Sequence, residues 1–212
     1  MKKIDRHELS RLHELTSLER LARSKGFLTI AGIDEAGRGP LAGPVVAAAC
    51  IIPGGVYISG VNDSKQLSPK RRAEIYDSIV SNDRIIFAVG QISSLEIDEI
   101  NIYQATIQAM LQAVARLSCI PDYLLVDGLK LPHKTIPGAK ITQGDTKSQS
   151  IAAASIIAKE TRDKLMREFH EMWPHYGFDQ HKGYGTEKHR KAIEVHGPCA
   201  IHRMTFEPLK QL

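Results

Sequence analysis

Two long runs of apolar residues stand out in the first quarter of the chain. Residues 28–34 and 45–52 show no regular alternation with polar residues, so they predict strands that are buried on both faces. Strands of this kind occupy the interior of a sheet. Shorter apolar runs predict three more strands, at residues 84–92, 122–127 and 139–142.

Apolar residues at helical spacing separate these strands. The face formed by every third or fourth residue from Ile102 to Leu117 predicts a helix that packs on the sheet. Further helices are predicted at residues 69–80, 146–172 and 186–195. Strands that alternate with helices predict an α/β fold, in which helices cover both faces of the sheet and a helical lobe follows at the C-terminus.

The first 26 residues predict two short helices ahead of the first strand. Leucine recurs there at every third position, a spacing that would carry the side chains around a single helix. These residues are Leu9, Leu12, Leu15, Leu18 and Leu21. The spacing of Thr16 and Glu19 predicts a capping box for the second helix, and Gly26 ends it. We expect the pair to pack on the main domain, with a partner-binding arm as the alternative.

Size and composition narrow the class of protein. With 212 residues, 42% of them hydrophobic, the chain is long enough for one sizeable core. Its longest apolar stretch falls well short of the roughly 20 residues that span a bilayer, and its charged N-terminus does not fit a secretory signal. We therefore expect no membrane partner and a cytoplasmic location. The spacing of the three cysteines predicts neither a zinc knuckle nor a disulfide framework.

Acidic residues follow the apolar strands. Asp34 and Glu35 end the first strand, Asp127 ends a later one, and Asp145 precedes the longest helix. Ligands of open α/β sheets bind at the carboxyl ends of strands, so these acids are candidates for one divalent-metal site with oxygen ligands. The alternative at each position is a turn former or a helix cap. Adjacent side chains on a strand point to opposite faces, so Asp34 and Glu35 share a site only if the strand ends or twists there, or if one binds through its backbone carbonyl.

A glycine-rich turn follows the first two acids. Gly37 and Gly39 allow a sharp turn and a close approach of a ligand to the main chain, and Arg38 between them is placed to meet a phosphate. An ordinary glycine turn with a solvated arginine is the alternative. The segment does not fit G-x-G-x-x-G, and no G-x-x-x-x-G-K-[ST] occurs, so Rossmann and P-loop nucleotide sites are not predicted.

Basic and aromatic residues elsewhere are candidates for contacts with a polyanion. Lys65 lies in a turn ahead of a helix, where it either binds phosphate or marks a solvated helix end. Tyr184, between Gly183 and Gly185, either stacks on a base or sugar or is buried at a junction. Basic residues concentrate in the stretch 182–203, although the net charge of +4 does not by itself indicate a polyanion partner. The histidines lack zinc spacing, and we expect them at the surface or as caps.

Seven segments, in order, make the chain resemble the type 2 ribonucleases H. They are GIDEAGRGPLAGPVVAAA, DSKQLS, INIYQATIQAM, LLVDG, GDTKSQSIAAASIIAKETRD, HKGYGT and HGPCAIHRMTF. The first and the fifth are long enough to be highly specific, and the segments together cover residues 28 to 206. Glu160 and Ala200 depart from the residues that are frequent in the family, and neither is a motif acid.

The resemblance implies a ribonuclease H-like fold, with a five-stranded mixed sheet flanked by helices and a C-terminal helical lobe. The residues that match the family's catalytic, metal-binding acids are Asp34, Glu35, Asp127 and Asp145. The residues that match its substrate-binding positions are Gly37, Arg38, Gly39, Lys65 and Tyr184. In the family the glycine–arginine–glycine loop reads the 2′-hydroxyl and neighbouring phosphates, the lysine lies near the phosphates, and the tyrosine packs on the sugar at the RNA-to-DNA junction.

The resemblance also implies an activity. It is that of an endonuclease that hydrolyses the RNA strand of RNA/DNA hybrids and cuts 5′ of ribonucleotides embedded in duplex DNA, leaving 5′-phosphate and 3′-hydroxyl ends. The cofactor would be Mg²⁺ or Mn²⁺, as two ions with substrate bound. We expect a monomer that serves DNA replication and ribonucleotide excision repair, with a replication protein as a candidate for its recruitment.

The implied organisation is an N-terminal helical extension at 1–26, a catalytic domain at 27–174 and a substrate-binding helical segment at 175–212. Two rival functions carry different expectations. A nucleic-acid-binding module without chemistry would keep its function after Asp34→Asn. An actin-like phosphotransferase would bind a nucleotide and would need a longer, duplicated chain than these 212 residues.

Overall fold

Five strands form one mixed sheet in the computed structural model, which describes residues 5–211. They span Ile30–Ala36 (β1), Val45–Ile51 (β2), Ile86–Ile92 (β3), Tyr123–Asp127 (β4) and Gly138–Ile141 (β5). Their order across the sheet is β3-β2-β1-β4-β5. β2 is antiparallel to β1 and β3, whereas β4 is parallel to β1 and β5. The two long apolar runs therefore form interior strands, as predicted.

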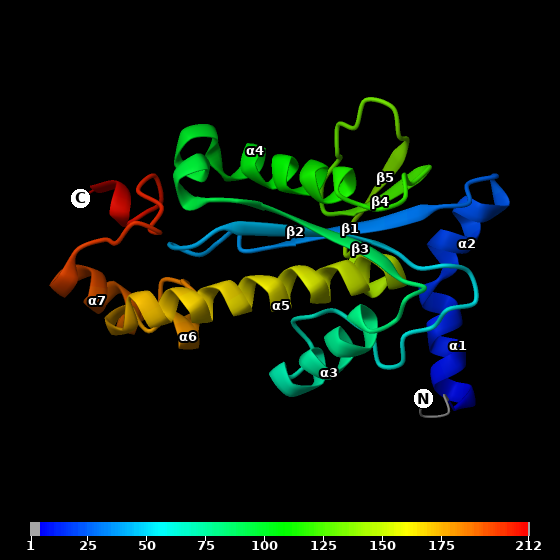
Figure 1. The fold of residues 1–212 in the computed structure, drawn as a ribbon, viewed down its shortest axis with the longest axis horizontal. Helices are drawn as coiled ribbons and strands as arrows, with labels where there is room; N and C mark the ends of the chain where they lie inside the picture. The colour runs from blue at the N-terminus through cyan, green and yellow to red at the C-terminus, as the bar shows by residue number, and fades with distance from the viewer. Residues whose placement is uncertain (1–4, 212) are drawn as a thin grey trace.

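Helices cover both faces of the sheet (Figure 1). The helix α4 (Ser94–Ala115) packs on one face, and α3 (Pro69–Val80) and α5 (Gln149–Met172) lie on the other. Ala47 of β2 belongs to the core beneath α4, while its neighbour Ala48 belongs to the core beneath α5. Successive residues of this strand thus enter opposite cores, which explains why it has no polar position. The predicted five-stranded mixed sheet flanked by helices is confirmed.

Two helices begin at residues that differ from the prediction. The helix α4 starts at Ser94 rather than near Ile102, because Ser93 and Glu96 form a capping box and Asn101, with φ 67°, interrupts the helical repeat. The helix α5 starts at Gln149 rather than at residue 146, because the preceding residues form a separate 3-10 turn. Both helices end close to the predicted positions.

The N-terminal segment folds into the two predicted helices, α1 (Arg6–Leu15) and α2 (Ser17–Ser24). The predicted capping box is wrong, because the Thr16 hydroxyl donates to the carbonyl of His13 and the Glu19 carboxylate points into the protein. Glu19 accepts hydrogen bonds from the Ser148 hydroxyl at 2.6 Å and from the Ser150 N–H and hydroxyl at 2.9 and 2.6 Å. These residues begin α5, so the extension packs on the main domain, as expected.

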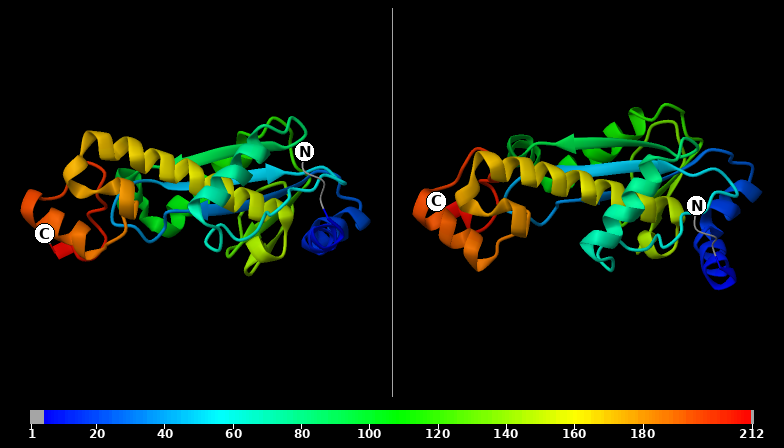
Figure 2. Two further views of the ribbon diagram at one scale, coloured as in Figure 1. Left: turned by 90° about the horizontal axis from the view of Figure 1, so that it is seen from below. Right: turned by 60° about the horizontal axis from the view of Figure 1, so that its bottom comes forward.

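The C-terminal residues form a lobe at the far end of α5. Figure 2 shows α5 running along the sheet into this lobe, with α1 and α2 at the opposite end of the molecule. The lobe contains the elements η2 (Pro174–Tyr176), α6 (Phe178–His181), α7 (Glu187–His196) and η3 (Leu209–Gln211). Tyr176 and Phe178 are buried there against Met166 of α5. The predicted helical lobe is therefore present.

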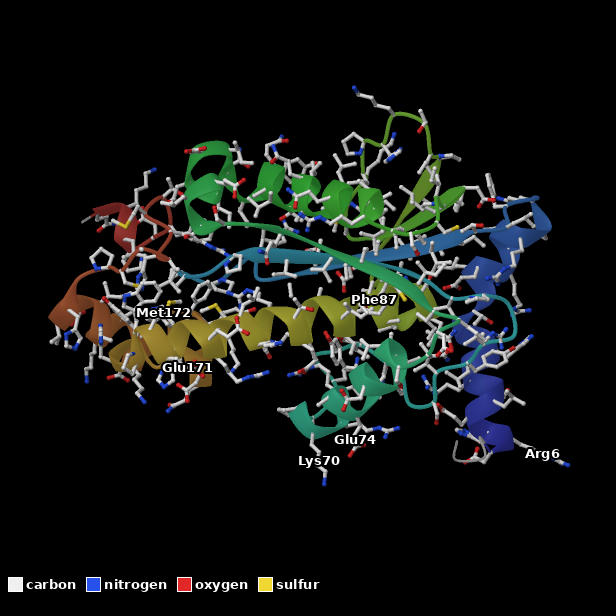
Figure 3. The ribbon with its side chains drawn as sticks, viewed as in Figure 1. Arg6, Lys70, Glu74, Phe87, Glu171 and Met172 are labelled. Atoms are coloured by element: carbon white, nitrogen blue, oxygen red, sulfur yellow. The ribbon has the colours of Figure 1, made fainter. Side chains whose placement is uncertain are left out.

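The helix α3 is joined to α5 by buried charges. Lys70 and Glu74 lie on the side of α3 that is turned away from the sheet (Figure 3). Arg72 on the other side donates to Glu160 at 2.6 Å and to Asp163 at 3.3 Å. Glu160, a departure from the resembled family, thus serves as an ion-pair partner. None of the helices in residues 5–211 is long and apolar enough to cross a membrane.

Candidate active site

Two neighbouring parallel strands bring acids to the same edge of the sheet. Asp34 lies near the end of β1, and Asp127 is the last residue of β4. Ile33 is level with Val126 in the parallel register, so the residues that follow them, Asp34 and Asp127, lie on adjacent strands at the same height. The strand ends thus bring together two of the four predicted acids.

A third acid reaches this edge through a backbone hydrogen bond. The Asp127 carboxylate accepts the N–H of Gly144 at 2.6 Å, and Gly144 is the first residue of the turn η1 (Gly144–Thr146). Asp145 lies in this turn and is buried. The N-cap of α5 is Ser148, whose hydroxyl accepts the N–H of Ile151. The alternative role of Asp145, as a helix cap, is therefore excluded.

Glu35 lies on the opposite face of β1 from Asp34. A Cβ on Gly32 would lie 2.2 Å from the backbone of Ser150, so Gly32 faces α5, and Asp34, two residues on, faces the same side. There burial raises the pKa of the Asp34 carboxyl, and the nearby Ser155 side chain of α5 opposes that rise. β1 continues one residue beyond Glu35, so the first of the three expected ways to share a site, a strand end between the two acids, does not apply. The Glu35 charge nevertheless raises the pKa of Asp34, which makes them electrostatic neighbours.

The clustered carboxylates oppose one another's ionisation. Burial, and then the charges of Glu35 and Asp127, hold the pKa of Asp34 well above its usual range. Burial also raises the pKa of Glu35. The pKa of Asp145 rises to about 6, through burial first and then through the neighbouring carboxylates of Asp63 and Asp127. A bound cation would relieve this repulsion.

Lys65 places a positive charge beside these acids. Burial alone would lower its pKa, but the nearby carboxylates, Asp34 first, outweigh that effect and raise it. The N–H of Lys65 donates to the Asp63 carboxylate at 2.8 Å, so Asp63 shapes the turn. The hydroxyl of Ser64 lies 2.8 Å from that of Ser155. The turn is thereby tied to Ser155 of α5, and the side chain of Lys65 is exposed.

The oxygen atoms of this site fit a hard divalent cation. The Oε2 atom of Glu35 is buried and has no hydrogen-bond partner among the described residues, so it is available as a ligand. Across residues 5–211, no three histidine, cysteine, aspartate or glutamate side chains already surround a point that could hold a metal ion. Mg²⁺ usually binds through one or two carboxylates and completes its shell with waters and substrate phosphates. The arrangement matches that mode of binding.

Two buried arginines hold the turn that follows β1. Arg203 donates to the carbonyls of Gly37 and Arg38 at 2.6 and 3.0 Å. Arg162 of α5 donates to the carbonyls of Ala42 and Pro44, both at 3.0 Å. Both guanidinium groups lie in the interior, at 0% and 1% relative exposure. The turn is therefore a built part of the site, rather than an ordinary glycine turn.

Gly37 occupies a position that excludes a larger residue. Its φ is +97°, and a Cβ there would lie 2.1 Å from Nε of Arg162. Arg38, the next residue, is exposed, and its guanidinium lies 3.4 Å from the carboxylate of Glu35. Arg38 therefore connects the turn with the acids. Its exposed donors fit the predicted contact with a phosphate.

Tyr184 lies beside the same turn. Its ring is 3.7 Å from where a Cβ of Gly39 would be, and its side chain is 47% exposed. The N–H of Leu41 donates to the carbonyl of Gly183 at 2.8 Å, which joins the turn to the lobe next to Tyr184. The alternative of a tyrosine buried at a junction is therefore wrong. The exposed ring is placed to stack on a ligand that contacts Gly39.

A chain of buried histidines fixes the backbone behind Tyr184. Nδ1 of His189 donates to the Tyr184 carbonyl at 3.0 Å, so its Nε2 accepts from Nε2 of His202, also at 3.0 Å. Nδ1 of His202 in turn accepts the N–H of Cys199 at 2.8 Å. Burial lowers the pKa of both histidines to about 4. The prediction that histidines lie at the surface or as caps is wrong for this pair.

Three contributors to the site were not predicted from the sequence. Asp63 precedes Lys65 in a turn, and no sequence pattern distinguishes it there from a solvated turn residue. The arginines Arg162 and Arg203 donate to carbonyls about 120 and 166 residues away along the chain, and no local pattern reveals such partners. A weak signal existed for Arg203, since it lies within the segment HGPCAIHRMTF.

Solved structures share the fold of this chain. The ribonuclease H2 from Pyrococcus horikoshii OT3 matches with a TM-score of 0.73 and 26% identity, covering 87% of this chain and 96% of its own. A ribonuclease HII from Archaeoglobus fulgidus, solved in complex with PCNA, matches with a TM-score of 0.69 and 26% identity, covering 85% of this chain and 96% of its own. The class of protein is therefore that of the ribonuclease H-like fold, as predicted.

Sequence relatives narrow this class to one family. The family model described as Ribonuclease HII matches residues 31–208. The ribonuclease HII of Chlamydia pneumoniae is 55% identical over 205 residues, which are 97% of this chain and 95% of its own. The chain belongs to the ribonuclease HII family and is a ribonuclease H, a hydrolase of RNA/DNA hybrids. The resemblance to type 2 ribonucleases H is confirmed, and the two rival functions are wrong.

Proposed function

We propose that this ribonuclease H cuts the phosphodiester bond on the 5′ side of ribonucleotides embedded in duplex DNA, as well as the RNA strand of hybrids. The products would carry 5′-phosphate and 3′-hydroxyl ends. One observation carries the proposal: the acids at the end of β1 are followed within two residues by a turn that presents exposed polar groups beside Tyr184. A residue that distinguishes ribose can therefore act next to the bond that is cut.

Ribonucleases H depend on a divalent metal ion, and the acids of this chain fit one. Asp34, Glu35 and Asp127, with Asp145 from the adjoining turn, would hold Mg²⁺ or Mn²⁺. Two such ions, when bound with substrate, would supply a water activated for attack and charge stabilisation at the leaving oxygen. The raised pKa values of Asp34, Glu35 and Asp145 support this assignment, since cations would keep these acids ionised at neutral pH.

The substrate would lie across the turn and the lobe. The exposed residues of Gly37–Gly39 would contact the 2′-hydroxyl and the phosphates on either side, because the 2′-hydroxyl is the group that distinguishes RNA from DNA. Tyr184 would pack on the sugar at the RNA-to-DNA junction. Lys65 would neutralise a phosphate next to the acids, where its raised pKa keeps it protonated.

The test is cleavage of a DNA duplex that contains one ribonucleotide, in Mg²⁺ or Mn²⁺, with an all-DNA duplex of the same sequence as control. We expect one cut, 5′ of the ribonucleotide, with a 3′-hydroxyl that a polymerase extends. Asp34→Asn should abolish it, and Asp83→Asn, an exposed aspartate on a distant turn, should not. A cut in both duplexes, or in neither, would contradict the proposal.

We further propose a role in ribonucleotide excision repair and DNA replication, and recruitment by a replication protein. The complex of the Archaeoglobus fulgidus ribonuclease HII with PCNA supports recruitment of this kind. We propose a monomer with three segments: a helical extension at 1–26, the catalytic domain at 27–174 and the substrate-binding segment at 175–212. Pull-down with a sliding clamp would test the recruitment, and light scattering of the free protein would test the monomeric state.

A further inference from the structure

Arg203 is a fully buried guanidinium whose hydrogen bonds all go to the backbone. It donates to the carbonyls of Gly37 and Arg38, and twice to that of Gly43 at 3.0 and 2.8 Å. Within residues 5–211 no carboxylate forms an ion pair with it, and its guanidinium carbon lies 5.0 Å from the centroid of the Phe206 ring. An unpaired buried charge is costly, so a role beyond packing is expected of it.

The bonds to Gly37 and Arg38 determine which way the turn presents its amides. In a planar trans peptide the C=O and the following N–H point in opposite directions. Because Arg203 holds the carbonyls of Gly37 and Arg38 toward the interior, the N–H groups of Arg38 and Gly39 are turned outward. Both residues are exposed, and among the described residues neither N–H donates to a protein acceptor. Two adjacent free donors therefore face the solvent beside Tyr184.

Other contacts fix the base of the turn without Arg203. The N–H of Leu41 donates to Gly183, and the N–H of Gly43 donates to Ile201. Arg162 holds Ala42 from the other side. Arg162 also packs against Gly37, but none of these hydrogen bonds is made to the carbonyl of Gly37 or Arg38. The hydrogen bonds that orient these two carbonyls come from the side chain of Arg203.

The charge of Arg203 adds to this geometry. A cation that accepts electron density from a carbonyl polarises the whole peptide unit and makes its N–H a stronger donor. Lysine would not substitute, because a single ammonium group cannot hold two successive carbonyls in the fork geometry of a guanidinium. The burial that lowers the pKa of Arg203 to about 9 leaves it charged at neutral pH.

We infer that Arg203 is a positioning residue for ribose recognition, which orients the amides of Arg38 and Gly39 toward the oxygen atoms of the 2′-hydroxyl and its neighbouring phosphate. The inference rests on the proposed function, because it assigns the acceptors of these amides to a ribonucleotide. Arg203 itself touches no substrate. It acts through the turn that it holds.

The test compares Arg203→Gln and Arg203→Lys in an Asp34→Asn background, which binds without cutting. Fluorescence anisotropy in Mg²⁺ gives the Kd of an all-DNA duplex and of the same duplex with one ribonucleotide. The ratio of the Kd for the all-DNA duplex to the Kd for the ribonucleotide-containing duplex measures ribose recognition. We expect this ratio to fall about tenfold in Arg203→Gln and by a smaller factor in Arg203→Lys. The control Ile79→Ala, in the core beneath α3, should lower Tm to a similar extent and keep the ratio.

The outcomes separate the inference from the proposed function. If the wild type cuts at the ribonucleotide and both Arg203 variants keep the parent's ratio, the inference is overturned and the proposed function stands. If the wild type does not cut there, the proposed function fails instead. Should Arg203→Gln fail to fold, Arg203→Lys decides alone, and an unchanged ratio in it overturns the inference.

Discussion

The buried carboxylate of Glu19 connects the N-terminal helices to the start of α5, and its contribution to the free energy of unfolding can be measured. It accepts three hydrogen bonds from Ser148 and Ser150, at the start of α5, and so stabilises the helix that follows the turn with Asp145. We predict that Glu19→Ala lowers the free energy of unfolding by about 3 kcal/mol. The loss would also loosen the position of Asp145, since its turn directly precedes this helix end.

The magnitude follows from what the substitution leaves behind. Hydrogen bonds to a charged acceptor are worth about 1.5 to 3 kcal/mol each, which would total well above 3. However, the hydroxyls of Ser148 and Ser150 lie 3.1 Å apart and can pair with each other. What remains without an acceptor is the buried N–H of Ser150 and one hydroxyl hydrogen, together about 1 to 3 kcal/mol, and the lost negative charge at the N-terminus of α5 adds up to about 1 kcal/mol.

Denaturant unfolding, followed by circular dichroism, is the assay. For a chain of this size, 3 kcal/mol corresponds to a fall in Tm of about 6 to 12 °C. Glu19→Gln keeps one acceptor and should lose about half as much. Glu14→Ala, an exposed glutamate on α1, is the matched control and should change stability by less than about 0.5 kcal/mol. A loss below about 1 kcal/mol for Glu19→Ala would refute the reasoning.

Three further predictions concern the site and the lobe. Gly37→Ala places a Cβ against Arg162, so we expect Tm to fall and cleavage to drop at least about tenfold. In EDTA, Asp145→Asn should be more stable than wild type by about 1 to 2 kcal/mol at pH 8 and equal to it at pH 4, because a carboxyl whose pKa rises from 3.8 to about 6 loses stability as pH rises through that window. For His189 and His202 the sign is reversed, because their folded pKa values of about 4 lie below 6.5. Stability is therefore complete above pH 6.5 and falls toward pH 4 by up to about 3 kcal/mol for each histidine.

Each of these predictions has a result that contradicts it. Wild-type cleavage by Gly37→Ala would show that Arg162 can move aside. A stability difference for Asp145→Asn that is the same at pH 4 and pH 8 would rule out carboxylate repulsion as its cause. The fluorescence of Trp173, the single tryptophan of the chain, reports on the lobe core. A denaturant midpoint, followed by this fluorescence, that stays constant from pH 7 to pH 4 would contradict the histidine prediction.

The hydrophobic pattern predicted correctly those strands and helices that are strongly buried, because burial dictates where their apolar residues stand in the sequence. All seven residues of β2 are buried, so its unbroken apolar run predicted an interior strand without any knowledge of its neighbours. The first turns of α4 escaped prediction because Asn101 adopts a positive φ and breaks the helical repeat. The capping box at Thr16 was wrong because the same Glu19 that fits a local cap finds three donors 129 to 131 residues away.

The candidate site likewise has a part that the sequence predicts and a part that depends on tertiary structure. Its acids were predictable because Asp127 ends β4 and Asp34 lies near the end of β1, and parallel neighbours place such ends together. The approach of Tyr184 to Gly39 depends on hydrogen bonds between the turn and the lobe, which only tertiary structure provides. The buried arginines were unpredictable for the same reason, since their acceptors are backbone carbonyls and carry no sequence signature.

The most direct measurement of the central claim, that the acids form one divalent-metal site, is the change in Tm with Mg²⁺ for wild type and Asp127→Asn. At a concentration 100 times its Kd, an ion that binds only the folded state adds about 2.7 kcal/mol. We predict that Mg²⁺ raises the Tm of wild type and of the control Asp83→Asn alike, and that of Asp127→Asn much less. Equal shifts in all three proteins would contradict the account.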